Sequence, residues 1–389
     1  MAGIVVRPRS RILHGHDWIY GTEVGKIFGD PQDGDVISLK DGRDRFLGSA
    51  IYNGTSAIVA RRFSHRRQAL DLDFFTRRLQ HAEALRQPLF GSDRPCRLVW
   101  SESDGLPGLV IDRFGGVLVC QIQTRALELR KAILVEALQN VFNFRGLVFR
   151  GDSSARVKEG LSSHPPEVHG EVPMEIVMEL EGVQFGIDVL SGQKTGFYLD
   201  QVDNYRSVAA YAQGVRVLDC FSNQGGFALT CAKRGAREVT AVESGAASLE
   251  RLQENVRRNE ADIRCVGADV FDFLKGEERR KSEYDLIILD PPSFTKARSR
   301  VQDALRGYHE LHLRAAKILS KRGIVASFSC SHHVSGEVFL ESIREAFCEA
   351  RRSARLKERL GQSPDHPVML HLPETEYLKG ILIEGIASF

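Results

Sequence analysis

The sequence predicts an α/β protein in which a doubly wound, mostly parallel sheet follows a small β-barrel-like module and a central α+β region. Two observations lead to this prediction. Strand-like and helix-like segments alternate along residues 215–330, which is the pattern of a parallel sheet. Before residue 70 the apolar runs are short and are separated by glycine, proline and aspartate turns. The expected domains span residues 1–70, 71–181 and 182–389.

Length and composition agree with several folded domains. The chain has 389 residues, and at roughly 100–200 residues per domain this length predicts two or three domains. No secretion signal and no run of about 18 apolar residues is apparent, so we expect a cytoplasmic protein without membrane contact. The seven cysteines include no CxxC pair, which argues against structural zinc, and we expect no metal.

The first 181 residues hold the two smaller modules. A turn at Asp41–Gly42 separates two β-rich runs, and apolar residues at helical spacing predict a connecting helix over 72–85. The strands "GLVIDRF", "VLVCQIQ" and "GLVFR" together with a helix over 127–141 give an α+β pattern. The segment "GLSSHPPEVHG" is expected to be an exposed loop.

Four acidic residues follow successive predicted strands of the C-terminal half. Asp219, Glu243, Asp269 and Asp290 stand at or just after strand ends, and in a doubly wound sheet all four face the ligand crevice. Glu243 is 24 residues beyond Asp219, where a carboxylate accepts hydrogen bonds from ribose hydroxyls, and Asp269 suits a purine amino group. A helix N-cap explains any one of these residues, but it explains the four together poorly.

The first strand-to-helix turn, "DCFSNQGGFA", is the expected loop against which this ligand binds. It lacks the GxGxxG spacing typical of dinucleotide binding. Its pair Gly225–Gly226 lets a ligand approach the backbone and the helix N-terminus. The turn and Glu243 together therefore predict a ribose-containing ligand.

The motifs "LDCFSNQGG", "AVES", "GADVF" and "DPPSF" resemble those of class I S-adenosylmethionine-dependent methyltransferases, which have a Rossmann-like fold. More narrowly, "SGQKTGFYLDQVDNY", "SFSCS" and "DHPVMLHLPETEYLKG" are similar to the RlmI-type cytosine carbon-5 methyltransferases of large-subunit ribosomal RNA. "HGHDWIYGTEV" is similar to that family's PUA domain, and "SESDGLPGLVIDRFGGVLV" to its central domain. The resemblance spans nearly the whole chain.

The resemblance implies S-adenosylmethionine as the methyl donor and ribosomal RNA as the partner, either 23S ribosomal RNA or the assembling large subunit. A homodimer is the one oligomer we consider. In that family a segment ahead of the first strand folds over the donor, with Lys194 near the methionine carboxylate; the alternative for Lys194 is an exposed hairpin lysine. Tyr377 and Lys379 are further residues expected near the site. The donor-binding residues are then Gln193, Lys194, Thr195, Phe197, Asp219, Ser222, Asn223, Gly225, Glu243, Asp269 and Asp290.

The turn "DPPSF" also predicts a place for the base that accepts the methyl group. Pro291–Pro292 fix φ at two successive positions and stiffen the backbone beside the switch point of the sheet. Asp290 offers one polar contact to a base edge and Phe294 a stacking face, as an extruded base requires. Pro291, Phe294 and Lys296 are the expected substrate-binding residues. Similar turns occur in methyltransferases of exocyclic amines, so the turn leaves the methylated atom open.

Cys330 distinguishes methylation of cytosine carbon-5 from methylation of an exocyclic amine. Carbon-5 of cytosine is a poor nucleophile until a thiolate adds to carbon-6, whereas an exocyclic amine needs no such help. A thiol with a pKa of about 8.5 is only partly ionised at neutral pH, so the dipole of a helix starting at Ser335–Gly336–Glu337 is expected to assist. The predicted catalytic residues are Cys330 and Asp290, and the remaining cysteines are expected to be packing residues.

The sequence leaves the base that removes the carbon-5 proton unidentified. Double-cysteine cytosine methyltransferases carry another cysteine where this chain has Pro292. His332 and His333 follow Cys330, but adjacent strand residues point in different directions, so at most one faces the site. The alternatives to cytosine carbon-5 methylation are an S-adenosylmethionine-dependent RNA N-methyltransferase and a non-catalytic RNA-binding factor.

Overall fold

The computed structural model describes residues 2–91, 93–295 and 298–386. The chain forms two compact units. Unit 1 comprises Met1–Ile176, Ile187–Leu199 and Pro364–Glu376, and unit 2 comprises Val177–Gly186, Asp200–Ser363 and Tyr377–Phe389. No helix among the described residues is both long enough and apolar enough to cross a membrane.

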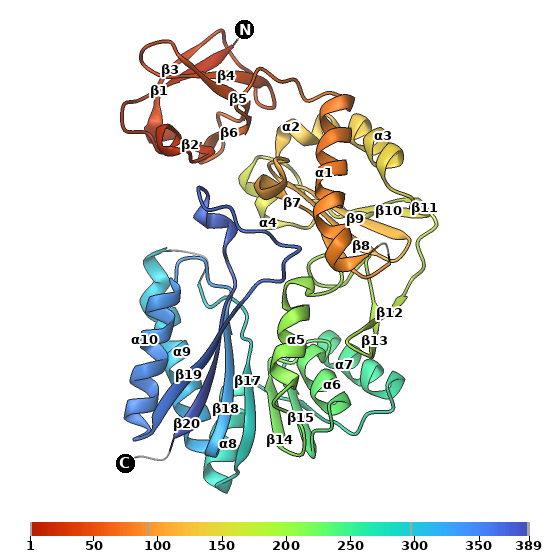
Figure 1. Cartoon of the computed structure of the whole chain (residues 1–389), viewed down its shortest axis with the longest axis vertical. Helices are drawn as coiled ribbons and strands as arrows, with labels where there is room; N and C mark the ends of the chain where they lie inside the picture. Colours follow the sequence, from red (N-terminus) through yellow and green to blue (C-terminus); the bar gives the residue numbers. More distant parts are fainter. Residues whose placement is uncertain (1, 92, 296–297, 387–389) are drawn as a thin grey trace. The chain divides into compact units, whose positions relative to one another are not determined.

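The first module of unit 1 is a six-stranded sheet in the order β2-β6-β5-β4-β1-β3 that curls about its own core (Figure 1). Its core contains Ile4, Ile19 and Leu39, which are fully buried. Its elements are β1 (Gly3–Val6), η1 (Arg11–His14), β2 (Trp18–Tyr20), η2 (Gly21–Glu23), β3 (Val24–Phe28), β4 (Val36–Lys40), β5 (Phe46–Tyr52) and β6 (Ile58–Ser64).

The turn expected at Asp41–Gly42 joins β4 to β5, as predicted. The Asp41 carboxylate accepts hydrogen bonds from the backbone N–H groups of Arg43 and Arg45, both at 2.9 Å. An aspartate that bonds its own chain in this way favours a turn over continued strand. The small β module expected before residue 70 is therefore confirmed.

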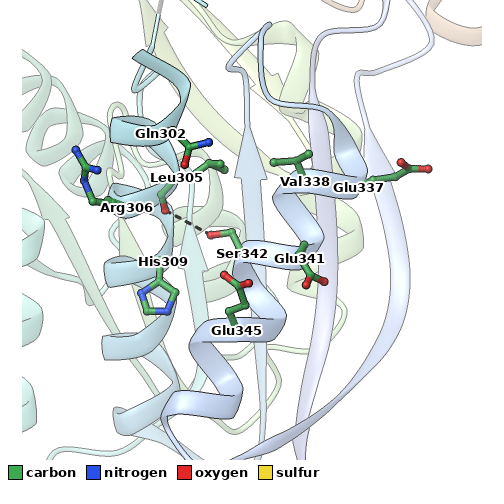
Figure 2. Close-up of a pocket in the computed structure, with 9 residues that line it drawn as sticks. All are labelled: Gln302, Leu305, Arg306, His309, Glu337, Val338, Glu341, Ser342 and Glu345. Atoms are coloured by element: carbon green, nitrogen blue, oxygen red, sulfur yellow. Dashed lines mark hydrogen bonds between the residues drawn. The ribbon is translucent and has the colours of Figure 1, made fainter. Parts of the chain in front are cut away.

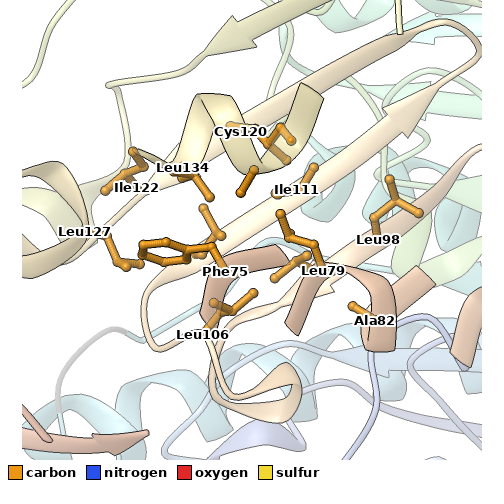
Figure 3. Packing of buried hydrophobic residues seen from close by; sticks show 14 of the residues in the cluster. Phe75, Leu79, Ala82, Leu98, Leu106, Ile111, Cys120, Ile122, Leu127 and Leu134 are labelled. Atoms are coloured by element: carbon orange, nitrogen blue, oxygen red, sulfur yellow. The ribbon is translucent and has the colours of Figure 1, made fainter. Parts of the chain in front are cut away.

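The second module of unit 1 packs helices against a five-stranded sheet in the order β11-β10-β9-β8-β7. Figure 3 shows Phe75 and Leu79 meeting Leu127 and Leu134 over this sheet, and all four are buried. The elements are α1 (Leu72–Phe90), β7 (Cys96–Trp100), η3 (Ser101–Asp104), β8 (Leu109–Phe114), β9 (Val117–Ile122), α2 (Arg125–Glu128), α3 (Lys131–Val141), β10 (Gly146–Phe149), α4 (Ser154–Lys158) and β11 (Glu167–Gly170).

Three details of this module differ from the sequence prediction. Helix α1 runs five residues beyond 85, and Leu85 is 48% exposed although it continues the apolar spacing. The helix expected over 127–141 is divided into α2 and α3 by a break at Leu129–Arg130. The end of the expected loop "GLSSHPPEVHG" is an edge strand, β11, which pairs antiparallel with β10. All four residues of β11 are exposed, so the hydrophobic pattern gave no indication of a strand.

Unit 2 is built on a seven-stranded sheet in the order β16-β15-β14-β17-β18-β20-β19. The pairs from β16 to β18 are parallel, and β20 runs antiparallel to both of its neighbours. The strands are β14 (Arg216–Cys220), β15 (Glu238–Glu243), β16 (Arg264–Gly267), β17 (Tyr284–Leu289), β18 (Leu319–Ser329), β19 (Ser353–Gly361) and β20 (Lys379–Ile386). A short hairpin, β12 (Ile176–Leu180) with β13 (Val183–Ile187), precedes them.

Helices cover both faces of this sheet, as Figure 1 shows for α5, α6 and α7 on one face and α9 and α10 on the other. Residues of α8, α9 and α10 share one core, which includes Phe273, Tyr308 and Phe339. The helical elements are η4 (Leu199–Gln201), α5 (Val202–Ala209), α6 (Gly226–Lys233), α7 (Ala246–Arg258), α8 (Val270–Arg280), η5 (Arg298–Arg300), α9 (Val301–Ile318) and α10 (Gly336–Glu349); η6 (Pro373–Thr375) belongs to unit 1. The predicted doubly wound sheet is confirmed, and its order reverses between β14 and β17.

Candidate functional site

The switch point of the unit 2 sheet brings three predicted carboxylates and Cys330 to one edge. Strands β14, β15 and β17 end in register, since Cys220 pairs with both Val242 and Leu289. Leu289 in turn pairs with Ser327 of β18. With strands about 4.8 Å apart and a rise of about 3.3 Å per residue, this register puts the backbones of Asp290 and Cys330 roughly 8 Å apart. Ligands of open α/β sheets bind beyond such an edge.

Asp219, next to the last residue of β14, is a buried carboxylate at this edge and is 1% exposed. Its Oδ2 accepts a hydrogen bond from the Ala228 N–H at 3.1 Å, and its Oδ1 has no hydrogen-bond partner among the described residues. Burial raises the pKa of Asp219 to about 7, and the negative charges of Asp290 and Glu243 add to this rise. A buried oxygen of this kind can accept a hydrogen bond from a bound ligand.

The loop in the first strand-to-helix turn, "DCFSNQGGFA", contains three residues with positive φ, namely Phe221 (63°), Asn223 (49°) and Gly225 (88°). Ser222 Oγ donates to the Asp219 carbonyl at 2.9 Å, and the Gly225 N–H donates to the Ser222 carbonyl at 2.8 Å. Positive φ in residues other than glycine is uncommon and costs free energy, and it concentrates at functional sites. The loop is therefore a tight, pre-formed turn at the end of β14.

The glycine pair in this loop has a packing reason that the sequence did not show. A Cβ added to Gly225 would lie 2.6 Å from Leu252 Cδ1, and one added to Gly226 would lie 2.3 Å from the ring of Tyr205. Both contacts are with protein side chains. The pair was expected to leave room for a ligand, whereas in the structure the missing side chains leave room for α7 and α5.

Glu243, the last residue of β15, uses both carboxylate oxygens to hold backbone N–H groups. Oε2 accepts from Asn223 at 3.0 Å and Oε1 from Gly245 at 2.7 Å. Each carboxylate oxygen can accept a second hydrogen bond, so ribose hydroxyls remain compatible with this arrangement. Asp269, in contrast, is exposed and is the N-cap of α8, accepting from the Asp272 N–H at 3.1 Å. The N-cap alternative considered for the four acids thus describes Asp269.

Asp290 follows β17 and is oriented by Gln201, a residue that the sequence analysis did not single out. Gln201 Nε2 donates to Asp290 Oδ2 at 3.0 Å. Gln201 is 2% exposed, and its Oε1 accepts from Asn204 Nδ2 at 2.6 Å. Asn204 also donates to the Gly361 carbonyl at 2.8 Å. The motif "LDQVDN" therefore supplies a buried amide chain that leads to the Asp290 carboxyl group.

The "DPPSF" turn that follows is partly buried. Pro291 is buried, and Phe294 packs against Tyr308 with ring centroids 4.8 Å apart and against Phe271 at 6.2 Å. These contacts hold the Phe294 ring within the core of α8 and α9. Its stacking against a base remains a prediction and requires ring surface outside those contacts. Lys296, the third predicted substrate residue, lies outside the described residues.

Cys330 is half-buried directly after β18, between two serines of a buried hydroxyl network. The Tyr308 hydroxyl contacts Ser329 Oγ at 2.9 Å and Ser331 Oγ at 3.0 Å. Ser331 Oγ also lies 3.3 Å from Ser293 Oγ of the "DPPSF" turn. Burial raises the pKa of Tyr308, so its hydroxyl stays protonated at neutral pH. This network joins the Cys330 backbone to the turn that carries Asp290.

Lys379 brings a positive charge to the same place. It pairs with Ser329 in the β18–β20 ladder, and its Nζ donates to the Ser331 carbonyl at 2.9 Å. Tyr377, two residues earlier, donates its hydroxyl to Asp200 Oδ2 at 2.6 Å. The helix start predicted after Cys330 is confirmed, because Ser335 caps α10 by accepting from the Val338 N–H.

The other candidate side chains are two histidines and the remaining cysteines. His332 and His333 are both exposed and lie edge to face, with centroids 5.5 Å apart. Cys220 is fully buried, and burial raises its pKa well above the usual value, as expected of a packing residue. Cys348 contradicts that expectation, because it is exposed on α10.

Comparison with known proteins agrees with this geometry. Residues 138–381 match the family model of S-adenosylmethionine-dependent methyltransferases, and residues 7–65 match a PUA-like domain. Two curated relatives are each named ribosomal RNA large subunit methyltransferase I. The one from Aeromonas salmonicida is 36% identical over 389 residues and covers 98% of both chains, and the one from Vibrio vulnificus is 36% identical over 391 residues with the same coverage.

The chain belongs to the ribosomal RNA large subunit methyltransferase I family of S-adenosylmethionine-dependent methyltransferases.

Solved structures share the fold of this methyltransferase. A putative S-adenosylmethionine-dependent methyltransferase from Streptococcus mutans superposes with a TM-score of 0.85 at 22% identity, covering 99% of this chain and 100% of that one. A putative methyltransferase complexed with SAH gives a TM-score of 0.84 at 23% identity, covering 96% and 97%. At these identities the similarity shows the fold alone.

The predicted donor segment ahead of β14 lies in unit 1 of the methyltransferase. Gln193 and Lys194 are exposed; Gln193 Oε1 accepts from the Tyr198 hydroxyl at 2.8 Å, and Lys194 Nζ lies 4.1 Å from the centroid of the Tyr198 ring. Thr195 is 1% exposed and donates to Asp112, which is itself ion-paired to Arg97. Phe197 is buried. Donor contacts of these four residues remain predictions.

A separate hollow of about 920 Å³ lies between α9 and α10 of unit 2. Figure 2 shows Glu341 and Glu345 of α10 across from His309 of α9, with Ser342 Oγ donating to the Leu305 carbonyl at 3.5 Å. Within the described part of the chain, none of the predicted site residues lines this hollow. It lies on a helical face and not at the edge of the sheet that carries Asp290 and Cys330.

Proposed function

We propose that the protein transfers a methyl group from S-adenosylmethionine to carbon-5 of a cytosine in large-subunit ribosomal RNA, with Cys330 as the nucleophile. The observation that supports this most directly is the register of β17 and β18, since it brings Asp290 and Cys330 to the ends of adjacent parallel strands at the switch point. The proposed reaction uses both groups, the thiol at carbon-6 of the cytosine ring and the carboxyl group at ring nitrogen 3.

The proposed reaction begins with the Cys330 thiolate. The sulfur adds to carbon-6 of cytosine, and the electron pair of the 5,6 double bond makes carbon-5 nucleophilic. The donor supplies an electrophilic methyl group, which carbon-5 takes up with release of S-adenosylhomocysteine. Loss of the carbon-5 proton to a base or to water then expels the thiolate and restores the double bond. Pro292 stands where double-cysteine enzymes have a second thiol, so the proton acceptor is another group.

Lys379 is proposed to support the ionised form of Cys330. Its ammonium group is held at the Ser331 carbonyl, one residue beyond the thiol. A cation close to a cysteine favours the thiolate over the thiol. The N-terminus of α10, which starts at Gly336 shortly after Cys330, is proposed to add a favourable dipole.

Asp290 is proposed to contact the base edge and to favour protonation at ring nitrogen 3. A hydrogen bond or proton at this nitrogen draws electron density from carbon-6 and eases the addition of sulfur. Gln201 holds one carboxyl oxygen through a 3.0 Å hydrogen bond, which limits rotation of the group. Gln201 is therefore a positioning residue for Asp290.

S-adenosylmethionine is proposed to bind at the ends of β14 and β15. Asp219 Oδ1 is buried and has no hydrogen-bond partner among the described residues, and Glu243 retains acceptor capacity at the end of β15. Ser222 and Asn223 lie in the tight loop between these carboxylates. Glu243 is proposed to accept the ribose hydroxyls. Asp269 keeps its predicted role at the purine amino group, although it is exposed and caps α8.

Ribosomal RNA is the proposed substrate because two curated relatives of nearly full length carry that substrate in their names, and because residues 7–65 match a PUA-like domain. Either 23S ribosomal RNA or the assembling large subunit serves in this proposal. A homodimer remains a prediction, and size-exclusion chromatography with light scattering tests it.

A covalent trap tests the proposed chemistry. Transcripts of large-subunit ribosomal RNA that contain 5-fluorocytidine cannot lose a proton from carbon-5, so the adduct with Cys330 should persist through denaturing electrophoresis in the presence of S-adenosylmethionine. Cys330→Ala should form no adduct, whereas Cys348→Ala, which alters an exposed cysteine on α10, should form as much as the unaltered protein.

Nucleoside mass spectrometry of unmodified RNA separates the alternatives. The proposal requires 5-methylcytidine in the product. An N-methylated nucleoside without a covalent adduct would assign the "DPPSF" turn to amine chemistry instead. Calorimetry that shows no binding of S-adenosylmethionine would point to a non-catalytic RNA-binding factor.

A further inference from the structure

A hollow lined by cations lies in unit 1 where β6 passes into α1. It has a volume of about 360 Å³ and is lined by Ser64, His65, Arg66, Gln68, Phe74, Arg77, Arg78 and His81. We call it the basic hollow. Among the described residues, three arginines and two histidines line it, and no aspartate or glutamate does. Every lining residue lies within an 18-residue stretch of unit 1, from Ser64 to His81.

Helical spacing produces one wall of the basic hollow. Phe74, Arg77, Arg78 and His81 are at positions i, i+3, i+4 and i+7 of α1, so they share one face of the helix. Phe74 is 1% exposed and forms the floor, and the guanidinium carbon of Arg78 lies 5.5 Å from the centroid of its ring. The chain that leaves β6 provides the opposite wall.

The cations of the basic hollow are poorly neutralised. No ion pair involves Arg66, Arg78 or His81 among the residues that the structure describes. Arg77 pairs with Asp73 at 2.8 Å, and both side chains of this pair are more than half exposed. Water screens such a surface pair strongly, so it leaves the Arg77 guanidinium able to bind a second anion.

Two groups of the basic hollow have pKa values that are lowered, mainly by burial. Arg78 donates to the Phe63 carbonyl at 3.3 Å, and burial together with the neighbouring Arg77 lowers its pKa. Burial and the charge of Arg62 likewise lower the pKa of His65. The charges of Asp104 and Asp17 oppose these two shifts, but burial and the neighbouring arginines outweigh them.

An adjoining hollow of about 270 Å³ shares Ser64, His65, Arg78 and His81, and its carboxylates are already paired. Asp17 accepts from Arg62 at 2.8 Å, and Asp104 accepts from Arg86 at 2.5 and 2.8 Å. Glu102 accepts from Arg61 at 2.7 Å. These acids are paired with other arginines, and Asp104 and Asp17 attract Arg78 and His65 without forming an ion pair with them among the described residues.

We propose that the basic hollow binds a phosphodiester group of the RNA substrate, with Arg66, Arg77 and Arg78 as its donors. Guanidinium groups match the geometry of phosphate oxygens, and such contacts position an RNA without reading its sequence. The proposal rests on the proposed function only in taking RNA as the substrate. The hollow opens to solvent through the exposed side chains of Arg66, Arg77 and His81, as a phosphate within a continuous strand requires.

Fluorescence anisotropy of the full-length protein with a labelled large-subunit ribosomal RNA fragment tests this proposal. The double variant Arg66→Gln, Arg77→Gln removes two exposed charges from the hollow, and Arg78→Gln removes the half-buried one. The matched control, Arg279→Gln with Arg344→Gln, removes two exposed arginines from α8 and α10 of unit 2. Thermal unfolding of each variant excludes a folding defect.

The hollow variants should weaken RNA binding about tenfold near 0.1 M salt, and each phosphate interaction that they remove should reduce the slope of log Kd against log salt by about 1. The control should change neither quantity. Equal reductions in the hollow variants and the control would overturn the proposal. Titration with inorganic phosphate tests whether the basic hollow binds free phosphate and not RNA. If the hollow variants abolished saturable phosphate binding but left the affinity for RNA unchanged, the proposal would also be overturned.

Methyl-transfer kinetics separate this inference from the proposed function. The hollow variants should raise the KM for RNA and leave kcat at saturating RNA and the Kd for S-adenosylmethionine unchanged. If the unaltered protein methylated no ribosomal RNA fragment, the proposed function would fail, while the anisotropy result would still decide whether the basic hollow binds RNA.

Discussion

Unit 1 and the strand edge of unit 2 both hold buried or partly buried carboxylates, but these are compensated in different ways. In unit 1 the buried acids meet guanidinium groups: Arg86 pairs with Asp104 and Arg97 with Asp112, with all four side chains at most 9% exposed. At the strand edge of unit 2, Asp219 and Glu243 accept hydrogen bonds from backbone N–H groups, and neither forms an ion pair within the described residues.

If Asp219 and Glu243 bind the methyl donor as proposed, this difference separates carboxylates that serve the fold from carboxylates that serve a ligand. A buried ion pair is satisfied within the protein, and removal of one partner leaves an uncompensated charge. A buried carboxylate without a cation keeps an unfavourable free energy that a ligand can relieve, which is characteristic of functional sites. Substitutions at the unit 2 edge should therefore reduce activity more than stability, and substitutions of unit 1 ion pairs should do the reverse.

Cys330→Ala should give the largest effect. Removal of a nucleophile should reduce methyl transfer by at least about 10³-fold, because no other thiol can add to carbon-6. The half-buried side chain contributes little packing, so the melting temperature should stay close to that of the unaltered protein. Tritium transfer and differential scanning calorimetry measure both quantities. A variant with undiminished 5-methylcytidine formation would exclude the covalent mechanism.

Arg86→Met tests the other side of the comparison. The substitution leaves Asp104 buried and unpaired, so the free energy of unfolding should fall by about 3–5 kcal/mol. The Kd of the folded protein for S-adenosylmethionine should not change. Urea titration followed by calorimetry measures both. Arg344→Met, which removes an exposed ion pair with Glu341, is the control and should leave the stability unchanged. A loss of donor affinity in Arg86→Met would contradict the division into structural and functional acids.

Glu243→Gln should weaken S-adenosylmethionine binding by roughly 10- to 100-fold, since a hydrogen bond to a charged group contributes about 1.5–3 kcal/mol. Glu238→Gln is the matched control, because Glu238 begins the same strand and pairs with Arg216 away from the edge. Calorimetric titration compares the two. If both variants bound the donor as tightly as the unaltered protein, Glu243 would have no contact with it.

Asp219→Asn should give the smallest effect, a change in how stability depends on pH. The folded pKa of about 7 lies above the unfolded value, so ionisation of the unfolded state removes stability as the pH rises from about 4 to about 7. An asparagine does not ionise, and the fall in melting temperature between pH 5 and pH 8 should be smaller in this variant. Identical pH profiles would show that Asp219 is ionised in the folded protein.

Much of the fold could be predicted from local patterns. The alternation of β and α segments from residue 215 onward correctly predicted a doubly wound, mostly parallel sheet. This was possible because each buried parallel strand is a short apolar run that lies between segments with helical spacing of apolar residues. The edge strand β11 and the break between α2 and α3 could not be predicted in this way. Exposed strand residues carry no hydrophobic pattern, and the break at Leu129–Arg130 depends on how two short helices pack on one sheet.

The candidate site likewise has features that local sequence patterns predict and features that they do not. The available chemical groups can be predicted from local patterns: acids stand at successive strand ends and Cys330 follows the last parallel strand, and strand order in a doubly wound sheet brings these carboxyl ends to one edge. The way in which those groups are held depends on tertiary contacts. Gln201 reaches Asp290 across 89 residues, Lys379 reaches Ser331 across 48, and Leu252 and Tyr205 account for the glycine pair. Contacts between residues so distant in the chain form only when the sheet assembles, and for that reason no local pattern predicts them.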